Sequence, residues 1–294
     1  MTDEETPPWI ETLAKLSGYV GMNRTQVRWR LIRWNERRKT PKAERAPIIR
    51  RADEQPGLSV STILALVIMT TYARVWVAQG GGFAAPPPLL LFDFGGQWQA
   101  TAPDEPWRLL TAIFLHAGIW HLLFNLFALA QIGPELETIW GRTSMLFIFV
   151  VTGIAGNIAS ASVHPNVIGI GASGGICGLI GAAIGYGQRL GNSRGIAIRN
   201  SMLRWLAYTI VFGFVVNADN IAHGGGAIAG GAFGYFVAPA VWRKRGLKPV
   251  RVIAGVIGIA ATIAAVAIIL TRQKHGDLYT IDFPALICGI TGNC

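Results

Sequence analysis

The chain has 294 residues, of which 51% are hydrophobic and only 14% are charged, whereas about 25% of the residues in a soluble domain are charged. With 36 glycines and a mean hydropathy of +0.41, this composition excludes an ordinary soluble domain and predicts an all-α polytopic membrane bundle. The net charge of +10 does not indicate nucleic-acid binding, because the basic residues gather in segments that would face one side of a membrane.

Seven apolar runs are long enough to cross the roughly 30 Å of hydrocarbon in a bilayer. Because only helices and closed barrels can span hydrocarbon, each run predicts a transmembrane helix. Residues 1–57 precede the first run and form a polar, basic segment. A cleavable signal peptide is not expected, since the first apolar run begins too late for one. The seven runs are 58–79, 109–131, 144–163, 171–188, 202–217, 221–242 and 252–270.

The connections between these runs alternate in basic content. Segment 1–57 and the connections 189–201 and 243–251 are rich in arginine and lysine, whereas 164–170 and 218–220 contain neither. By the positive-inside rule, the N-terminus is therefore cytoplasmic and the C-terminus external. No organelle-targeting pattern precedes the first run, so we expect a bacterial inner membrane with the C-terminus in the periplasm.

Two segments outside the runs have a distinctive composition. Residues 24–39 combine basic and aromatic side chains, which predicts either a helix on the anionic inner leaflet or a solvated basic arm. Residues 80–106 contain glycine, proline and tryptophan but no basic residue. This second segment is too long for a simple turn, so we expect a folded loop at the outer interface.

The three cysteines have no metal-binding spacing, and we expect neither a metal nor a cofactor. Cys177 lies in the fourth apolar run and is predicted to be a free packing thiol. Cys288 and Cys294 both lie in the C-terminal tail. They would either pair, if that tail faces an oxidising compartment, or remain free.

Ser173 opens the fourth run, and His223 stands at the head of the sixth. A hydroxyl and an imidazole on two membrane helices form a possible nucleophile and general base. Glycine stripes on both helices predict a close backbone approach, which would bring the two groups within about 2.6–3.2 Å. The alternative is that Ser173 is a packing residue bonded to its own backbone. The stripes contain Gly174, Gly178, Gly181 and Gly185 in one helix and Gly226, Gly230 and Gly234 in the other.

The second run contains three further polar residues, His116, His121 and Asn125. On a helical wheel His121 and Asn125 share a face, whereas His116 lies about 140° from His121. The sequence therefore predicts that His121 and Asn125 point at one spot and that His116 makes another contact. In the predicted topology, these residues, Ser173 and His223 all lie at a similar shallow depth below the outer surface.

These residues, in this order, resemble the rhomboid intramembrane serine proteases over residues 58–245. The resemblance implies a six-helix core at 58–245, followed within 246–294 by a seventh transmembrane helix and a short external tail. The matching motifs are Trp107-Arg108, His116 with His121 and Asn125, Gly133 with Glu137 and Gly141, Gly171-Ala172-Ser173-Gly174, and Ala222-His223 with Gly226 and Gly230.

The resemblance also implies roles for individual residues. Ser173 would be the nucleophile, His223 its general base, and His121, Asn125 and the backbone N–H of Ser173 would hold the oxyanion. His116 would be structural, and Trp107-Arg108 with Glu137 would stabilise the long first loop and its surroundings. Cys177 departs from the pattern, because some members have a tyrosine there that stacks on the histidine. Asp219 is expected to cap the sixth helix rather than complete a triad.

The expected function is an endopeptidase that cleaves transmembrane segments of membrane proteins near the outer face, with those substrates and the lipid bilayer as its partners and no nucleic acid. By analogy with the family, the fifth span, with Trp205, Phe212 and Phe214, would be the lateral gate, capped by loop 217–222. A non-catalytic family member that binds membrane proteins is the alternative. A transporter is disfavoured, because no run has a central carboxylate.

Overall fold

The computed structural model describes residues 7–19, 27–28, 31–32, 35, 58–82, 84–101, 103–164, 167–216 and 218–273. The chain divides into two compact units, Met1–Ile49 and Arg50–Cys294. In the first unit, α1 (Pro8–Tyr19) buries Ile10 and Ala14. Most of 24–39 lies outside the described residues, as do Cys288 and Cys294, so the predictions made for them stay predictions.

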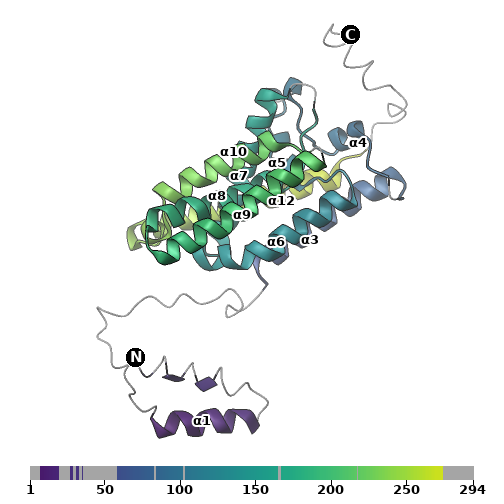
Figure 1. Ribbon diagram of the computed structural model, residues 1–294. Coiled ribbons are helices and arrows are strands. Elements are labelled where there is room, and N and C mark those ends of the chain that lie inside the picture. Colours follow the sequence, from purple (N-terminus) through teal and green to yellow (C-terminus); the bar gives the residue numbers. More distant parts are fainter. Residues whose placement is uncertain are drawn as a thin grey trace. The chain divides into compact units, whose positions relative to one another are not determined.

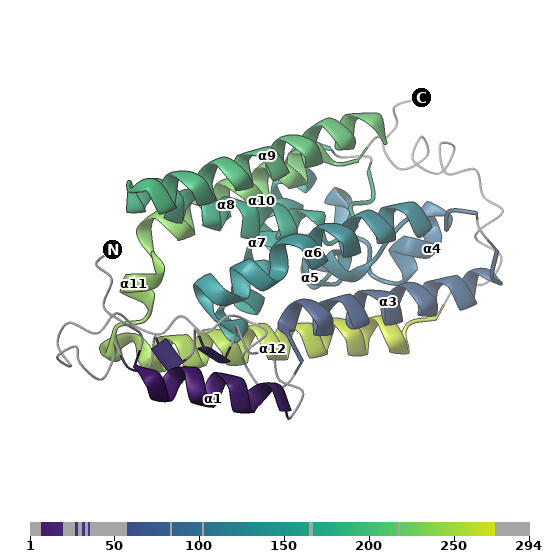
Figure 2. The ribbon, with the colours of Figure 1, turned by 60° about the horizontal axis from the view of Figure 1, so that its bottom comes forward.

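The regular elements among the described residues of the second unit are all helices, and Gln97 and Gly169 form an isolated antiparallel bridge in the loops between them. The glycine-rich helix α8 lies at its centre and contacts α6, α7, α9 and α10. In Figure 2, α9 lies on one side of α8 and α10, and α3 lies beside α12 on the other. The all-α bundle predicted from the sequence is confirmed. The elements of Figure 1 are α3 (Val60–Gln79), α4 (Pro88–Asp93), η2 (Gln99–Thr101), α5 (Arg108–Thr111), η3 (Ala112–Phe114), α6 (Ile119–Trp140), α7 (Arg142–Val163), α8 (Ser173–Leu190), α9 (Ser193–Val215), α10 (Asn220–Phe236), α11 (Pro239–Trp242), η4 (Arg245–Leu247) and α12 (Lys248–Thr271).

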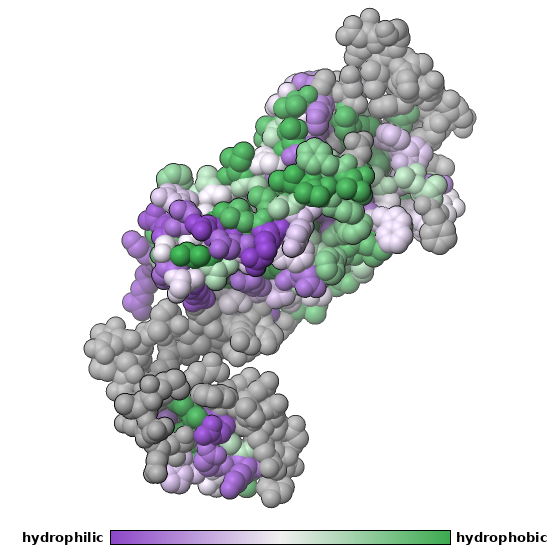
Figure 3. All heavy atoms as spheres, viewed as in Figure 1, coloured by the Kyte–Doolittle hydropathy of each residue, from purple (hydrophilic) through white to green (hydrophobic). Residues whose placement is uncertain are grey.

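A long helix corresponds to each of the seven predicted runs, but fewer are typical spans. Among the described residues, α3, α7 and the segment Arg245–Thr271 are long and apolar enough to cross a membrane, and α5–η3 with α6 forms a fourth candidate that is bent by 87°. The remaining three helices are not candidate spans by length and composition. Of these, α10 has 17 residues, α9 carries several arginines, and α8 is rich in glycine. Figure 3 shows hydrophobic residues across the middle of this unit and hydrophilic residues at one end. The chain is a multi-pass integral membrane protein.

The second predicted span, 109–131, is wrong as a continuous helix. The chain turns through α5 and η3, becomes extended at Leu115, and begins α6 only at Ile119. Gly118 has φ = 144°, a conformation that suits glycine and cannot continue a helix. The carbonyl of Phe114 accepts a hydrogen bond of 2.6 Å from the Thr71 hydroxyl of α3. A tertiary contact thus satisfies a carbonyl that a continuous helix would have used itself.

The glycine stripes of α8 and α10 bring the two backbones into contact, as the sequence predicts. A Cβ atom on Gly226 would lie 2.1 Å from the carbonyl oxygen of Gly174, and one on Gly230 would lie 1.8 Å from that of Gly178. In the other direction, a Cβ on Gly181 would lie 2.1 Å from the carbonyl oxygen of Ala227. We call this contact the glycine seam. A methyl group at these positions would force the helices apart.

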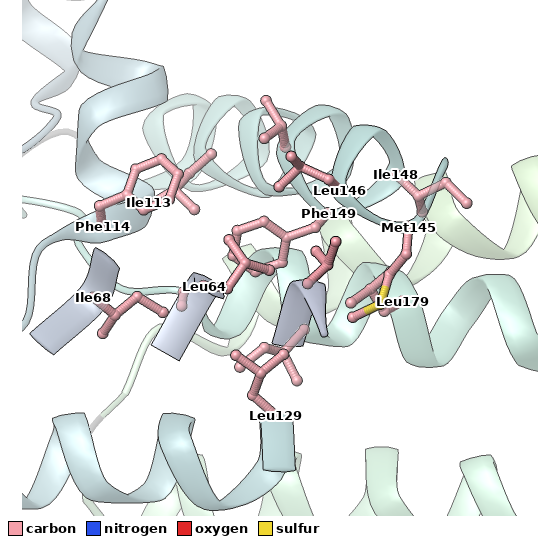
Figure 4. Close-up of a cluster of buried hydrophobic side chains, with 14 of the residues drawn as sticks. Leu64, Ile68, Ile113, Phe114, Leu129, Met145, Leu146, Ile148, Phe149 and Leu179 are labelled. Atoms are coloured by element: carbon pink, nitrogen blue, oxygen red, sulfur yellow. The ribbon is translucent and has the colours of Figure 1, made fainter. Parts of the chain in front are cut away.

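A buried cluster around Phe149 of α7 anchors the other side of the bundle. It contains Leu64 and Ile68 from α3, Phe114 from η3 and Leu179 from α8, all of them fully buried (Figure 4). The rings of Phe114 and Phe149 meet edge to face, with centroids 6.2 Å apart. This cluster places η3, and hence the chain leading into α6, against α7 and α8.

Glu137 stabilises the start of α3. It stands near the end of α6 and is fully buried, where its Oε1 accepts hydrogen bonds from the backbone and hydroxyl of Ser61, at 2.8 and 2.6 Å. Ser61 is in the first turn of α3, whose free N–H groups and positive dipole end stabilise a carboxylate. Glu137 therefore ties α6 to the start of α3.

We expect Gly230→Ala to lower the free energy of unfolding by about 1–3 kcal/mol, the usual range for overpacking a tight contact. The measurement is the thermal unfolding midpoint in detergent micelles. Gly224→Ala is the matched control on the same helix, because nothing lies within 4 Å of its added carbon. Equal midpoints for the two variants would contradict the glycine seam as a structural constraint.

Candidate active site

Ser173 is the first residue of α8, and Gly171 determines how the chain enters this helix. Gly171 has φ = 119°, and its N–H donates to the carbonyl of Ala112 at 2.8 Å. No side chain caps the helix. The first N–H groups of a helix have no partner within it, and they lie at the positive end of the helix dipole. Ser173 therefore combines a hydroxyl with nearby backbone donors suited to a negative charge.

The hydroxyl of Ser173 lies 2.8 Å from Nε2 of His223. This distance confirms the predicted proximity of the two groups across the glycine seam. His223 lies in the first turn of α10 and is almost completely buried. Asp219 caps this helix as expected, because its Oδ1 accepts from the N–H of Ala222 at 2.9 Å, while its other oxygen accepts from the Ser160 hydroxyl.

Asn220, which the sequence analysis did not identify, holds the other side of the imidazole. Its Oδ1 lies 3.0 Å from Nδ1 of His223, and its Nδ2 donates to the carbonyl of Ile210 at 3.3 Å. An amide oxygen can only accept, so Nδ1 carries the proton and the lone pair of Nε2 faces the Ser173 hydroxyl. This is the tautomer that a general base needs. The clue in the sequence was an amide three residues before His223, within one helical turn.

His121 lies beside Ser173. A Cβ atom on Gly171 would be 2.8 Å from Nε2 of His121 and 3.7 Å from Oγ of Ser173, so both groups border the same small space. Asn125 follows one turn later in α6 and donates one amide hydrogen to the carbonyl of His121 at 2.8 Å. The second amide hydrogen is left for another acceptor.

The helical-wheel prediction for His116 is wrong. Its ring is buried and lies next to that of His121, with centroids 4.9 Å apart. The wheel assumed a helix from His116 to His121, but residues 115–118 are not helical. His116 therefore packs against the His121 ring instead of facing away from it.

Residues 84–101 are folded, and Arg108 holds much of this loop in place. Its guanidinium donates to Oε2 of Glu105 at 2.7 Å and to the carbonyls of Phe92 and Gly96. It also lies 3.7 Å from the centroid of the Phe92 ring and 4.5 Å from that of Trp107. Arg108, the first residue of α5, thus stabilises the first loop, with Trp107 against its guanidinium.

The remaining site predictions concern the surroundings. Cys177 is a free, fully buried thiol one turn after Ser173, and Gly226 and Gly230 belong to the glycine seam. Among the described residues, no group of three or more His, Cys, Asp or Glu side chains is placed to hold a metal ion. The site presents a hydroxyl hydrogen-bonded to an oriented imidazole, next to backbone N–H donors. This arrangement is suited to acyl transfer.

Comparison with known proteins identifies a domain around this site. The family model described as "Rhomboid domain" matches residues 103–240. Rhomboid protease GluP from Bacillus subtilis (strain 168) is 37% identical over 188 residues, which is 60% of this chain and 34% of GluP. RHOMBOID-like protein 6, mitochondrial, from Arabidopsis thaliana is 35% identical over 137 residues, 46% of this chain and 44% of the relative.

A relative from a third organism gives a similar result. Rhomboid-like protease 5 from Toxoplasma gondii is 34% identical over 135 residues, 45% of this chain and 16% of the relative. The chain thus spans less than half the length of these three relatives. Ser173, His223, Asn220, His121 and Asn125 all fall within the matched domain.

We expect Asn220→Ala to slow labelling of Ser173 by a fluorophosphonate probe about five- to tenfold, the factor that corresponds to losing one hydrogen bond of about 1 kcal/mol or slightly more. Without the amide oxygen, the imidazole is free to adopt the wrong tautomer or orientation. Asn220→Asp keeps an acceptor toward Nδ1 and should retain most of the labelling rate. If Asn220→Ala labels as fast as the wild type, Asn220 does not orient His223.

Proposed function

The chain belongs to the rhomboid family, and we propose that it is an intramembrane serine endopeptidase that cleaves transmembrane segments of other membrane proteins. The observation that carries this proposal is the distance of 2.8 Å between Ser173 Oγ and His223 Nε2. The hydrogen bond from His223 to Asn220 supports it, because it directs the basic nitrogen at the hydroxyl. The proposed cleavage site in the substrate lies near the outer face of the membrane.

In the proposed reaction, His223 Nε2 accepts the proton of Ser173 as Oγ attacks the scissile carbonyl. The protonated imidazole then gives this proton to the leaving amine nitrogen as the peptide bond breaks. An acyl-enzyme remains on Ser173. Water attacks its ester carbonyl, His223 takes the proton of that water and returns it to Oγ, and the acid product leaves.

The negative charge of the tetrahedral intermediate needs donors that are already in place. We assign this role to the N–H of Ser173, the imidazole of His121 and the amide of Asn125. The uncapped start of α8 and the position of His121 beside Gly171 support the assignment. Removing one donor of this kind typically slows a reaction by about 10²–10³.

Substrates would enter between α6 and α9. These helices meet through aromatic side chains, with ring centroids 4.0 Å apart for Phe124 and Phe212 and 6.1 Å apart for Phe127 and Trp205. The main packing of α9 is against α8, so α9 can separate from α6 without opening the glycine seam. A substrate helix must unwind locally before Ser173 can reach its carbonyl. Small or helix-breaking residues near the cut would favour this step.

The same proposal includes an orientation, with a cytoplasmic N-terminus and Ser173 near the outer surface. The concentration of basic residues in 1–57, 189–201 and 243–251 supports it. The non-catalytic alternative is disfavoured, because both Ser173 and His223 are retained and hydrogen-bonded to each other. Buried Glu137 does not favour a transporter, since its Oε1 is bonded to Ser61.

We expect Ser173→Ala to reduce cleavage of a reporter membrane substrate in liposomes by at least about a thousandfold, because loss of a nucleophile removes the covalent pathway. The cleavage products are quantified on gels. Ser162→Ala is the control, since Ser162 is exposed on α7 and, among the described residues, its hydroxyl bonds to Ile158 of its own helix. Undiminished cleavage by Ser173→Ala would end the assignment of the nucleophile.

We expect Phe212→Ala to speed cleavage of a transmembrane substrate about two- to tenfold, since an aromatic pair stabilises the closed contact by about 0.5–1.5 kcal/mol. Initial rates in liposomes test this. Phe214→Ala is the matched control, because Phe214 is on the same helix and 76% exposed. The gate assignment fails if both variants cleave at the wild-type rate, or if Phe214→Ala is accelerated equally.

A further inference from the structure

Arg204 is an uncovered arginine near the middle of α9 (Ser193–Val215). It is exposed in the bundle, and so are its neighbours Leu203, 44% exposed, and Tyr208, 64% exposed. In Figure 2, α9 lies at the edge of the helical bundle, with only one of its sides facing α8 and α10. Arg204 has no hydrogen bond or ion pair with any residue that the structure describes.

Two other arginines in this half of the chain, Arg199 and Arg243, have partners. Arg199, five residues earlier on α9, donates to Oε1 of Gln188 at 2.8 Å. Arg243 donates to the carbonyls at the end of α6, at 2.7 Å for Ile139. Among the described residues, Arg204 thus differs from Arg199 and Arg243, which hold helices together.

The depth of Arg204 follows from the orientation proposed above, in which α9 crosses the membrane with Val215 toward the outer surface. From Arg204 to Val215 the helix rises roughly 17 Å at 1.5 Å per residue, against roughly 30 Å of hydrocarbon. With this outer part of α9 in the membrane, Arg204 lies inside the hydrocarbon and not at its inner edge. A guanidinium facing hydrocarbon is costly without an anion, and its long side chain can extend toward the headgroup region.

We propose that Arg204 binds the phosphate of an anionic phospholipid. A guanidinium matches a phosphate with two parallel hydrogen bonds. Tyr208 lies one turn further along the same face and offers a hydroxyl to the headgroup. Leu203 and Val211, both exposed, provide apolar surface for an acyl chain. An anionic headgroup is favoured over a zwitterionic one, whose own ammonium group competes for the phosphate.

Lipid binding at Arg204 does not depend on catalysis. Arg204 lies on the helix that carries Phe212, and only an effect of the bound lipid on the gate rests on the proposed function. The binding can therefore be measured on the Ser173→Ala protein as well as on the wild type. A failure of the protease proposal would leave that measurement intact.

The test is native mass spectrometry of the purified full chain, titrated with phosphatidylglycerol or phosphatidylcholine. We expect phosphatidylglycerol to bind more tightly, and Arg204→Gln to weaken this binding at least about fivefold, as expected for the loss of a charge-assisted hydrogen bond. Arg204→Lys should lie between them, since lysine keeps the charge but not the paired hydrogen bonds. Tyr208→Phe should have a smaller effect, of about two- to threefold.

Arg245→Gln is the matched control, because it removes the same charge from an exposed position on η4. Its affinity for phosphatidylglycerol should equal that of the wild type. The proposal is overturned if Arg204→Gln binds like the wild type, if both glutamine variants weaken binding equally, or if the two lipids bind equally well. The thermal unfolding midpoint establishes that each variant is folded.

Discussion

The direct backbone contact between α8 and α10 is the constraint on which the site depends. With glycine at positions 226 and 230, carbonyls of α8 lie where side chains would otherwise be. The first residue of α8 and the first turn of α10 therefore lie at the same end of the seam. A serine hydroxyl and an imidazole nitrogen can meet at 2.8 Å there without either side chain reaching across a gap. Larger residues in the seam would separate them by more than a hydrogen bond can span.

Groups at the start of α10 and from neighbouring elements then orient what the seam brings together. Asn220 selects the tautomer of His223, and Asp219 fixes the start of α10 through Ala222 and Ser160. From the opposite side, the chain between η3 and α6 carries His121 toward Gly171. These contacts are short and mostly buried, so the polar groups are arranged before any substrate arrives. Such preorganisation is the main way in which a protein stabilises developing charge.

The errors made from the sequence have a common physical origin. Both His116 and the second span were judged on the assumption that an apolar run is one regular helix, whereas Gly118 and the bond from Thr71 to Phe114 break it. Asn220 was missed because an amide side chain near the start of a helix usually caps that helix or contacts water. In each case a contact between distant segments decided the outcome.

By itself, the sequence determined the membrane class, the positions of most helices and the pairing of Ser173 with His223. Those features follow from local hydropathy and from glycine periodicity, which one helix carries in its own residues. Only the tertiary structure decided the bend before α6, the contact of His116 with His121, and the orientation of His223 by Asn220. These depend on which carbonyls and side chains meet after the helices pack, and no single segment contains that information.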